Sequence, residues 1–67
     1  MKYIIAHYGT NGHLAFWDNS QFPMFRKQLD RATIFNSLQD AWSDWYDALE
    51  AVENPDNVQI LEYPAPY

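Results

Sequence analysis

Cysteine is absent from the 67 residues, so the chain has neither a disulfide nor a thiolate metal ligand. This absence favours a reducing compartment, and we expect a cytoplasmic protein. No stretch approaches the roughly 20 consecutive apolar residues of a membrane-spanning helix. The N-terminal run Met1–Ala6 is too short for the apolar core of a signal peptide. We therefore expect no membrane partner.

Lys and Arg are absent after Arg31, whereas seven acidic residues follow Asn36. Segments 1–35 and 36–67 carry formal charges of +2 and −7, which together give the net charge of −5. Direct nucleic-acid binding requires a basic stripe that displaces counterions, so the charge argues against that function. An acidic balance instead favours a basic protein as partner, including one that itself binds nucleic acid.

Several segments have the β-branched and aromatic residues that are typical of strands. They are Lys2–Tyr8, His13–Trp17, the shorter Ala32–Phe35, and Val58–Tyr63. Gly9–Gly12 predicts a hairpin turn, and a turn centred on Thr10 and Asn11 would pair His13 with Tyr8. The segment from Asp18 to Pro23 is turn-like. Met24–Arg31 is either one helical turn or an irregular loop that carries a basic cluster.

An amphipathic helix is the clearest element. Asn36 or Ser37 can cap it, and it should run to about Glu53, where Asn54-Pro55 stops it. The apolar residues fall on one arc of about 120°. They are Leu38, Ala41, Trp42, Trp45, Ala48, Leu49 and Val52. We expect this arc, including both tryptophans, to belong to the core.

The order β-β-(β)-α-β predicts a single α+β domain over residues 1–67. One helix with one apolar face needs a sheet to cover it, so we expect a small two-layer sandwich. Its antiparallel sheet of three to four strands would pack against the one helix. The last strand, Val58–Tyr63, should pair with the first, because Lys2–Tyr8 has the composition of a central strand.

Acidic residues gather on the side of the helix opposite the apolar arc, where all of them should be exposed. Asp40, Asp44, Asp47 and Glu50 would form a row about 15 Å long. One DNA strand presents a charge about every 3.4 Å, so such a row suits a phosphate-binding channel. Like charges three and four residues apart each cost a few tenths of a kcal/mol, which suggests a function. The alternative is an acidic face that is merely solvated.

Catalytic and metal-binding patterns are missing from the sequence. A straight helix side spreads its carboxylates too far apart to converge on one cation, so we expect no metal and no cofactor. His7 and His13 have no third partner fixed by the sequence. The serines lack the strand–turn–helix context of a nucleophile. We therefore expect a protein that is not an enzyme.

Twelve aromatic residues are more than so small a core can enclose, so some rings must be exposed. The run Phe22–Phe25, followed by Arg26 and Lys27, predicts a protruding contact loop. Its apolar residues could instead cover the open side of the sheet or form a homodimer interface. The predicted partner-binding residues are Asp40, Asp44, Asp47, Glu50, Glu53, Phe22, Phe25 and Tyr46.

These features favour a non-catalytic module that binds a basic protein through its acidic helix and aromatic loop. Small, acidic, cysteine-free chains resemble phage-encoded anti-restriction and anti-CRISPR inhibitors in size and charge. That resemblance implies an inhibitor that mimics nucleic acid in a partner's binding site. The alternative is a self-associating accessory module, a homodimer whose acidic face is only solvated.

Overall fold

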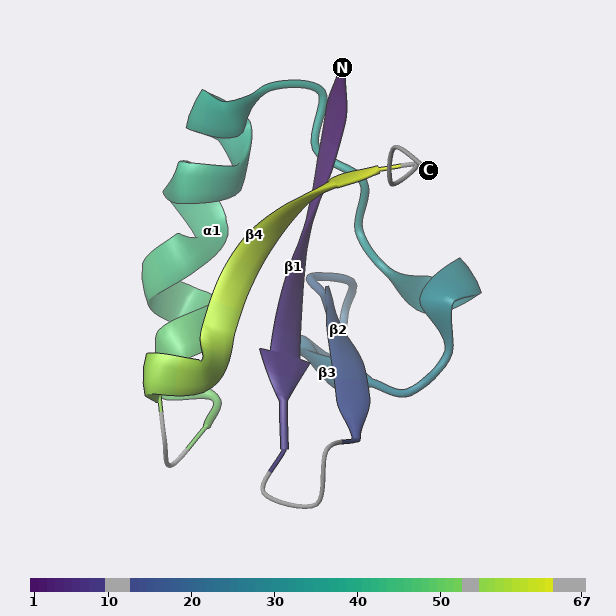
Figure 1. Ribbon diagram of the computed structural model, residues 1–67, viewed down its shortest axis with the longest axis vertical. Helices are drawn as coiled ribbons and strands as arrows, with labels where there is room; N and C mark the ends of the chain where they lie inside the picture. The colour runs from purple at the N-terminus through teal and green to yellow at the C-terminus, as the bar shows by residue number, and fades with distance from the viewer. Residues whose placement is uncertain (10–12, 53–54, 64–67) are drawn as a thin grey trace.

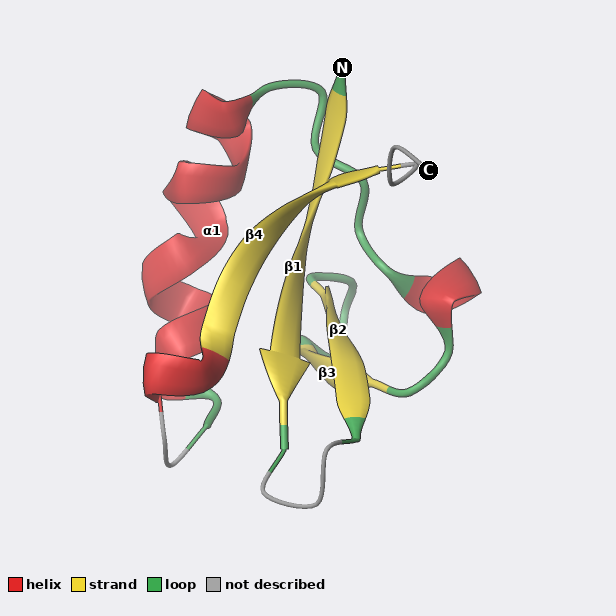
Figure 2. Ribbon diagram, viewed as in Figure 1, coloured by secondary structure: helices red, strands yellow, loops and turns green. Residues whose placement is uncertain are grey.

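The computed structural model describes residues 1–9, 13–52 and 55–63, which form four strands and one α-helix (Figures 1 and 2). The predicted turn at 10–12, Glu53 and the tail 64–67 lie outside the described residues. The elements are β1 (Lys2–Tyr8), β2 (Leu14–Asp18), β3 (Met24–Arg26), α1 (Leu38–Glu50) and β4 (Val58–Tyr63), with 3-10 turns at Leu29–Arg31 and Pro55–Asn57. Neither α1 nor a 3-10 turn among these residues is long and apolar enough to cross a lipid bilayer.

The four strands form one antiparallel sheet in the order β3-β2-β1-β4. β1 is central, and it pairs with β4 from Lys2 to His7, with Ile5 opposite Ile60. α1 covers one face of this sheet (Figure 1). The predicted α+β two-layer sandwich and the predicted pairing of the first and last strands are both confirmed.

The β1–β2 hairpin is shifted by one residue from the predicted register. Tyr8 lies opposite Leu14, and the Gly9 N–H donates to the His13 carbonyl oxygen at 2.7 Å. The predicted pairing of Tyr8 with His13 is therefore wrong. The observed register places Trp17 on the helix side of the sheet, in the main core cluster. A slip of one residue would turn that ring to the other face, so its burial favours the observed register.

Segment 24–31, predicted as one helical turn or an irregular loop, contains the strand β3, which was not predicted, followed by one 3-10 helical turn. β3 pairs with β2, and Phe25 lies opposite Trp17 with 5.2 Å between ring centroids. The predicted strand at 32–35 is reduced to one bridge, in which Phe35 pairs with Tyr3. The presence of β3 and the lack of a full strand at 32–35 both depend on cross-strand contacts, and these contacts are not visible in the local pattern of apolar residues.

The helix begins as predicted and ends earlier. Ser37 is the N-cap, and its Oγ accepts a hydrogen bond from the Asp40 N–H at 3.1 Å. α1 ends at Glu50 instead of near Glu53. The next two N–H groups bond to carbonyls three residues back, which tightens the last turn into 3-10 geometry.

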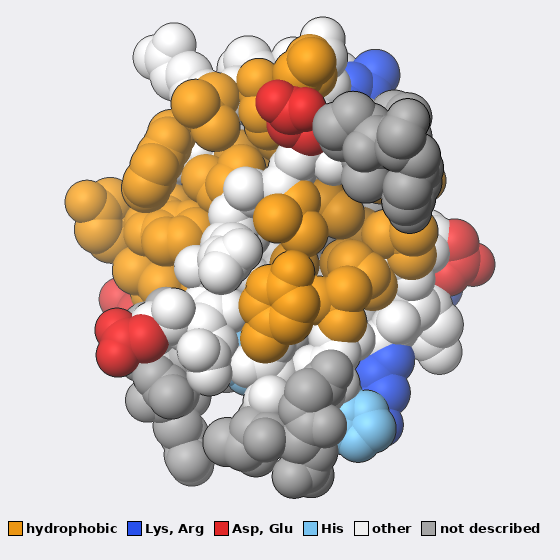
Figure 3. Space-filling model, in the orientation of Figure 1, with side chains coloured by type: hydrophobic (Ala, Val, Ile, Leu, Met, Phe, Trp, Pro, Cys, Tyr) orange, Lys and Arg blue, Asp and Glu red, His pale blue; other side chains and the backbone are white. Residues whose placement is uncertain are grey.

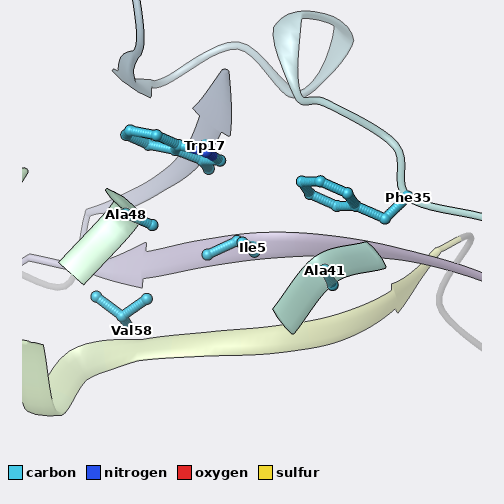
Figure 4. Packing of buried hydrophobic residues seen from close by; sticks show 6 residues of the cluster. All are labelled: Ile5, Trp17, Phe35, Ala41, Ala48 and Val58. Carbon is cyan, nitrogen blue, oxygen red and sulfur yellow. The ribbon is translucent and has the colours of Figure 1, made fainter. Parts of the chain in front are cut away.

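The main core lies between α1 and the sheet. Ala41 and Ala48 of the helix have no exposed surface, and they lie in one cluster with Ile5 and Val58 (Figure 4). Their small side chains let the helix approach the strands closely. The other face of the sheet carries a smaller cluster of Ile4, Ala6 and Phe16, against which Ala32, Leu61 and Tyr63 pack.

The helix is rotated relative to the predicted apolar arc. Trp42 and Leu38 are 49% and 46% exposed, so their assignment to the core is wrong, whereas Trp45 packs against the main cluster as expected. At 100° per residue, Trp42 lies about 100–120° around the axis from Ala41 and Ala48, which point at the sheet. Trp42 instead rests against Trp45, with 5.0 Å between ring centroids.

Candidate functional site

Asp44 connects α1 to the end of β2. Its Oδ2 accepts hydrogen bonds from Trp17 Nε1 at 3.3 Å and from Asn19 Nδ2 at 2.6 Å. Trp17 is only 2% exposed, and a buried indole N–H needs an acceptor. Asp44 is half-buried, so the prediction that all the helix acids are exposed is wrong for this residue.

Asn19 also holds the 19–23 turn against the segment that precedes the helix. Its backbone N–H donates to Thr33 Oγ1, and its Oδ1 accepts from the same hydroxyl, both at 2.9 Å. The Thr33 N–H donates to the Trp17 carbonyl oxygen at 2.9 Å. Three segments that are distant in the sequence are thereby fixed relative to one another beside the middle of α1.

A buried carboxylate closes the same turn. Asp18 is 5% exposed; its Oδ1 accepts from the Ser20 N–H at 3.0 Å, and its Oδ2 accepts from Arg26 Nε at 2.6 Å. The Ser20 N–H, followed by the Arg26 guanidinium, lowers the pKa of the Asp18 carboxyl below its usual value of 3.8. The start of the 19–23 turn is therefore held by an ion pair and a backbone hydrogen bond, both made by Asp18.

An open hollow of about 400 Å³ lies between this turn and the acidic flank of α1, which we define as Asp40, Asp44, Asp47 and Glu50. The hollow is lined by Trp17, Asn19, Pro23, Asp44, Asp47, Glu50 and Ala51. Three of these residues are acidic and none is basic. The structure thus brings three of the predicted acids together around one concave surface, and Asp40 lies outside it.

The acids of the hollow have no basic neighbour within the described part of the chain. Arg26 forms an ion pair with Asp18 and not with these acids. Asp47 and Glu50 are exposed, so their charges face water. Asp40 is exposed in the first turn of α1, where the helix dipole favours a negative charge.

The predicted aromatic residues lie in three different places. Phe22 is 70% exposed on the 19–23 turn, next to Pro23 of the hollow. Phe25 is half-buried between Trp17 and His7, with ring centroids 5.2 and 5.4 Å away. Tyr46 is 73% exposed, on the flank of α1 that faces away from the hollow. Of the three, only Phe22 directly precedes a residue that lines the hollow.

Trp17, Asn19 and Pro23 line the hollow but were not predicted as site residues. The sequence contained one usable signal, because a buried tryptophan requires an acceptor for its N–H. Choosing Asp44 as that acceptor required the three-dimensional arrangement of β2 and α1, which lie 27 residues apart at this contact.

Metal binding has no support from the described side chains, since no three of their His, Asp or Glu residues are arranged to hold an ion. The hollow instead suits cationic side chains of another protein. Carboxylates accept hydrogen bonds from Lys and Arg, and the exposed Pro23 and Ala51 offer apolar surface for their aliphatic stems. No family model, no curated protein and no solved structure matches the chain, so this geometry is the basis for a functional proposal.

Proposed function

We propose that the protein is a non-catalytic binding module that takes a basic segment of a partner protein into the acidic hollow. The observation that carries the proposal is the convergence of Asp44, Asp47 and Glu50 on one open hollow without a basic lining residue. An isolated solvated helix would leave its acids spread over its surface. Here the 19–23 turn forms a second wall, so a side chain inserted between them meets carboxylates and apolar surface together.

Affinity in this arrangement requires both kinds of contact. Each exposed ion pair contributes only about 0.2–1 kcal/mol, so the carboxylates mainly speed the encounter and set its salt dependence. Phe22, which is 70% exposed and precedes the lining residue Pro23 in the chain, supplies the aromatic contact that slows dissociation. The partner segment is thus basic and carries apolar groups beside its Lys or Arg residues.

The partner class that we propose is a nucleic-acid-binding protein, whose phosphate-binding cleft is rich in Lys and Arg. Occupying that cleft would make the chain an inhibitor of the phage type that its size and charge resemble. Asp44 is half-buried and bonded to Trp17, so the exposed members of the acidic flank are Asp40, Asp47 and Glu50. Along the axis they are spaced by about 10 and 4.5 Å, a sparser row than the sequence predicted.

An affinity capture with two matched variants tests this function. The hollow variant Asp47→Asn/Glu50→Gln and the control Asp30→Asn/Glu62→Gln remove the same two charges at different places. We expect the immobilised wild type and the control to retain the same basic protein from an extract of the source cells. The hollow variant should not retain it.

Elution identifies the kind of partner. Salt should release the captured protein, because screening weakens contacts between exposed charges. Duplex DNA should also release the captured protein if that protein binds the hollow through its own nucleic-acid-binding cleft. Equal capture by the hollow variant would refute the role of the hollow. Capture that resists competing DNA would keep the binding function and reject nucleic-acid mimicry.

A further inference from the structure

The outer edge of β4 presents unpaired backbone groups within the described part of the structure. Tyr3 exchanges both of its backbone hydrogen bonds with Phe35, at 2.9 and 2.8 Å, on the side of β1 away from β4. Residues along a strand direct their N–H and C=O groups to alternate sides, so the even-numbered residues of β1 bond to β4. Their β4 partners are odd-numbered. The N–H and C=O groups of Ile60 and Glu62 therefore point outward. Val58 offers no free edge, because it is 5% exposed and directly follows the 3-10 turn Pro55–Asn57.

An uncharged strip of α1 lies on the same side of the molecule. This strip, which we call the apolar flank, comprises Leu38, Trp42, Trp45, Tyr46 and Leu49. Leu38, Trp42 and Tyr46 are 46%, 49% and 73% exposed. Because Asp44 bonds to Trp17 of β2, the acidic flank is on the β2 side and the apolar flank is on the β4 side. Figure 3 shows hydrophobic side chains gathered over α1 in the view in which β4 is nearest.

We propose that a second copy of this chain binds here, through antiparallel pairing of β4 with β4 about a two-fold axis at Leu61. In this register Ile60 of each copy faces Glu62 of the other. Both outward residues then exchange backbone hydrogen bonds with a partner residue, whereas a register centred on Ile60 would place Glu62 opposite the buried Val58. The result is an isologous dimer with one continuous eight-stranded sheet.

The apolar flank favours a second copy over a foreign strand. The two helices lie on the same face of the joined sheet. Each α1 contacts mainly its own β1, and the two β1 strands are three strand spacings apart. With strands about 4.8 Å apart, the helix axes are therefore about 14 Å from one another. That separation exceeds the usual 8–10 Å for packed helices, and the large rings of Trp42 and Tyr46 from both copies fill the difference. A foreign strand would pair with β4 and leave these rings in water.

Charge and area are consistent with a weak dimer. Two chains of net charge −5 meet along uncharged flanks while their acidic flanks face apart, and each Glu62 lies opposite an isoleucine. The exposed parts of Trp42 and Tyr46 supply roughly 250 Å² per copy. With the edge of β4 added, the total falls near the lower limit of about 1,000 Å² for a specific interface. Dimer formation should therefore depend on concentration, and both hollows stay open.

Sedimentation equilibrium combined with hydrogen exchange tests the dimer. We expect the wild type to pass from monomer to dimer as its concentration rises. Across that range the amides of Ile60 and Glu62 should gain protection. The amides of Gln59, Leu61 and Tyr63, which already bond to β1, should change little.

Two variants complete the test. Trp42→Lys/Tyr46→Lys places charge on the apolar flank and should remain monomeric, while its circular-dichroism spectrum and cooperative unfolding show that the fold is intact. Gln39→Lys/Ser43→Lys adds the same charge elsewhere on α1 and should still dimerise. A wild type that is monomeric at every concentration overturns the proposal, as does a dimer without protection at β4. A dimer that survives the charged flank also overturns it, and none of these outcomes affects capture by the hollow.

Discussion

Asn19 and Asp44, which are 25 residues apart in the chain, share a hydrogen bond of 2.6 Å between Nδ2 and Oδ2. The same Oδ2 accepts from the indole N–H of Trp17 at 3.3 Å. One carboxylate thus fixes both walls of the hollow, the 19–23 turn and the acidic flank of α1. Asp44 therefore has a structural role that the neighbouring acids of the flank do not share.

Replacing Asp44 with Ala should destabilise the fold by about 1–2 kcal/mol, because the buried Trp17 N–H loses its acceptor. The free energy of unfolding from urea titration measures this effect. Asp47→Ala gives the same gain in helix propensity without breaking a hydrogen bond in the described structure, so it should stay within about 0.5 kcal/mol of the wild type. Asp44→Asn, which keeps an acceptor oxygen, should recover part of the loss. Equal effects of the two Ala variants would contradict the structural role of Asp44.

The cap of α1 offers a second test. Ser37→Ala removes the oxygen that accepts from the Asp40 N–H and should cost about 1 kcal/mol of stability. Ser43 also makes a hydrogen bond, in which its Oγ donates to the Gln39 carbonyl at 3.1 Å. That carbonyl sits inside the helix, so Ser43→Ala should be neutral or slightly stabilising. Thermal unfolding of both variants distinguishes a cap from an ordinary exposed serine.

The lowered pKa of Asp18 predicts a dependence of stability on pH. A carboxyl whose pKa is lower in the folded state stabilises the fold fully above its unfolded value of 3.8, and this contribution disappears as the pH falls through the lowered pKa. Wild type should therefore exceed Asp18→Asn in stability at neutral pH, and the gap should narrow only below about pH 3.8. Urea midpoints of both proteins across that range provide the measurement. A gap that stays constant into strong acid would argue against the Asp18 network.

Close packing at Ala48 predicts sensitivity to added volume. Ala48 has no exposed surface and lies in the cluster of Ile5, Trp17 and Val58, so Ala48→Leu should cost about 1–3 kcal/mol by overpacking. Ala51, one turn further on, is exposed, and Ala51→Leu should change stability by less than about 0.5 kcal/mol. Chemical denaturation of the pair checks the close approach of α1 to the sheet. A tolerated leucine at position 48 would mean that the helix stands further away.

Local sequence signals predicted the elements that have local causes. Ser37 lies just before an amphipathic run, so its side-chain cap was predictable. The strand at Met24–Arg26 was not, because it forms through Phe25 against Trp17 and Arg26 against Asp18. These cross-strand contacts have no signature in a window of a few residues.

The rotation of the helix explains the errors in the candidate site. A helical wheel identifies which residues are apolar, but not which part of the apolar arc meets the sheet. The bonds of Asp44 to the end of β2 turn Ala41 and Ala48 toward the strands. Trp42 therefore lies on the partly exposed flank of α1, on the β4 side. The acids were therefore predictable as a group, and their division into structural and exposed members was not.

An NMR titration of the chain with a short arginine-rich peptide tests the central claim most directly, with the Trp17 indole N–H as the reporter in the wall of the hollow. The account predicts that this signal and the Asn19 side-chain amide shift on binding, and that added salt weakens the affinity. Asp47→Asn/Glu50→Gln should weaken it by about 2- to 30-fold, which corresponds to two exposed ion pairs. Asp30→Asn/Glu62→Gln should bind like the wild type. Equal affinity of all three proteins, or shifts confined to residues far from Trp17, would contradict the claim that the hollow binds basic segments.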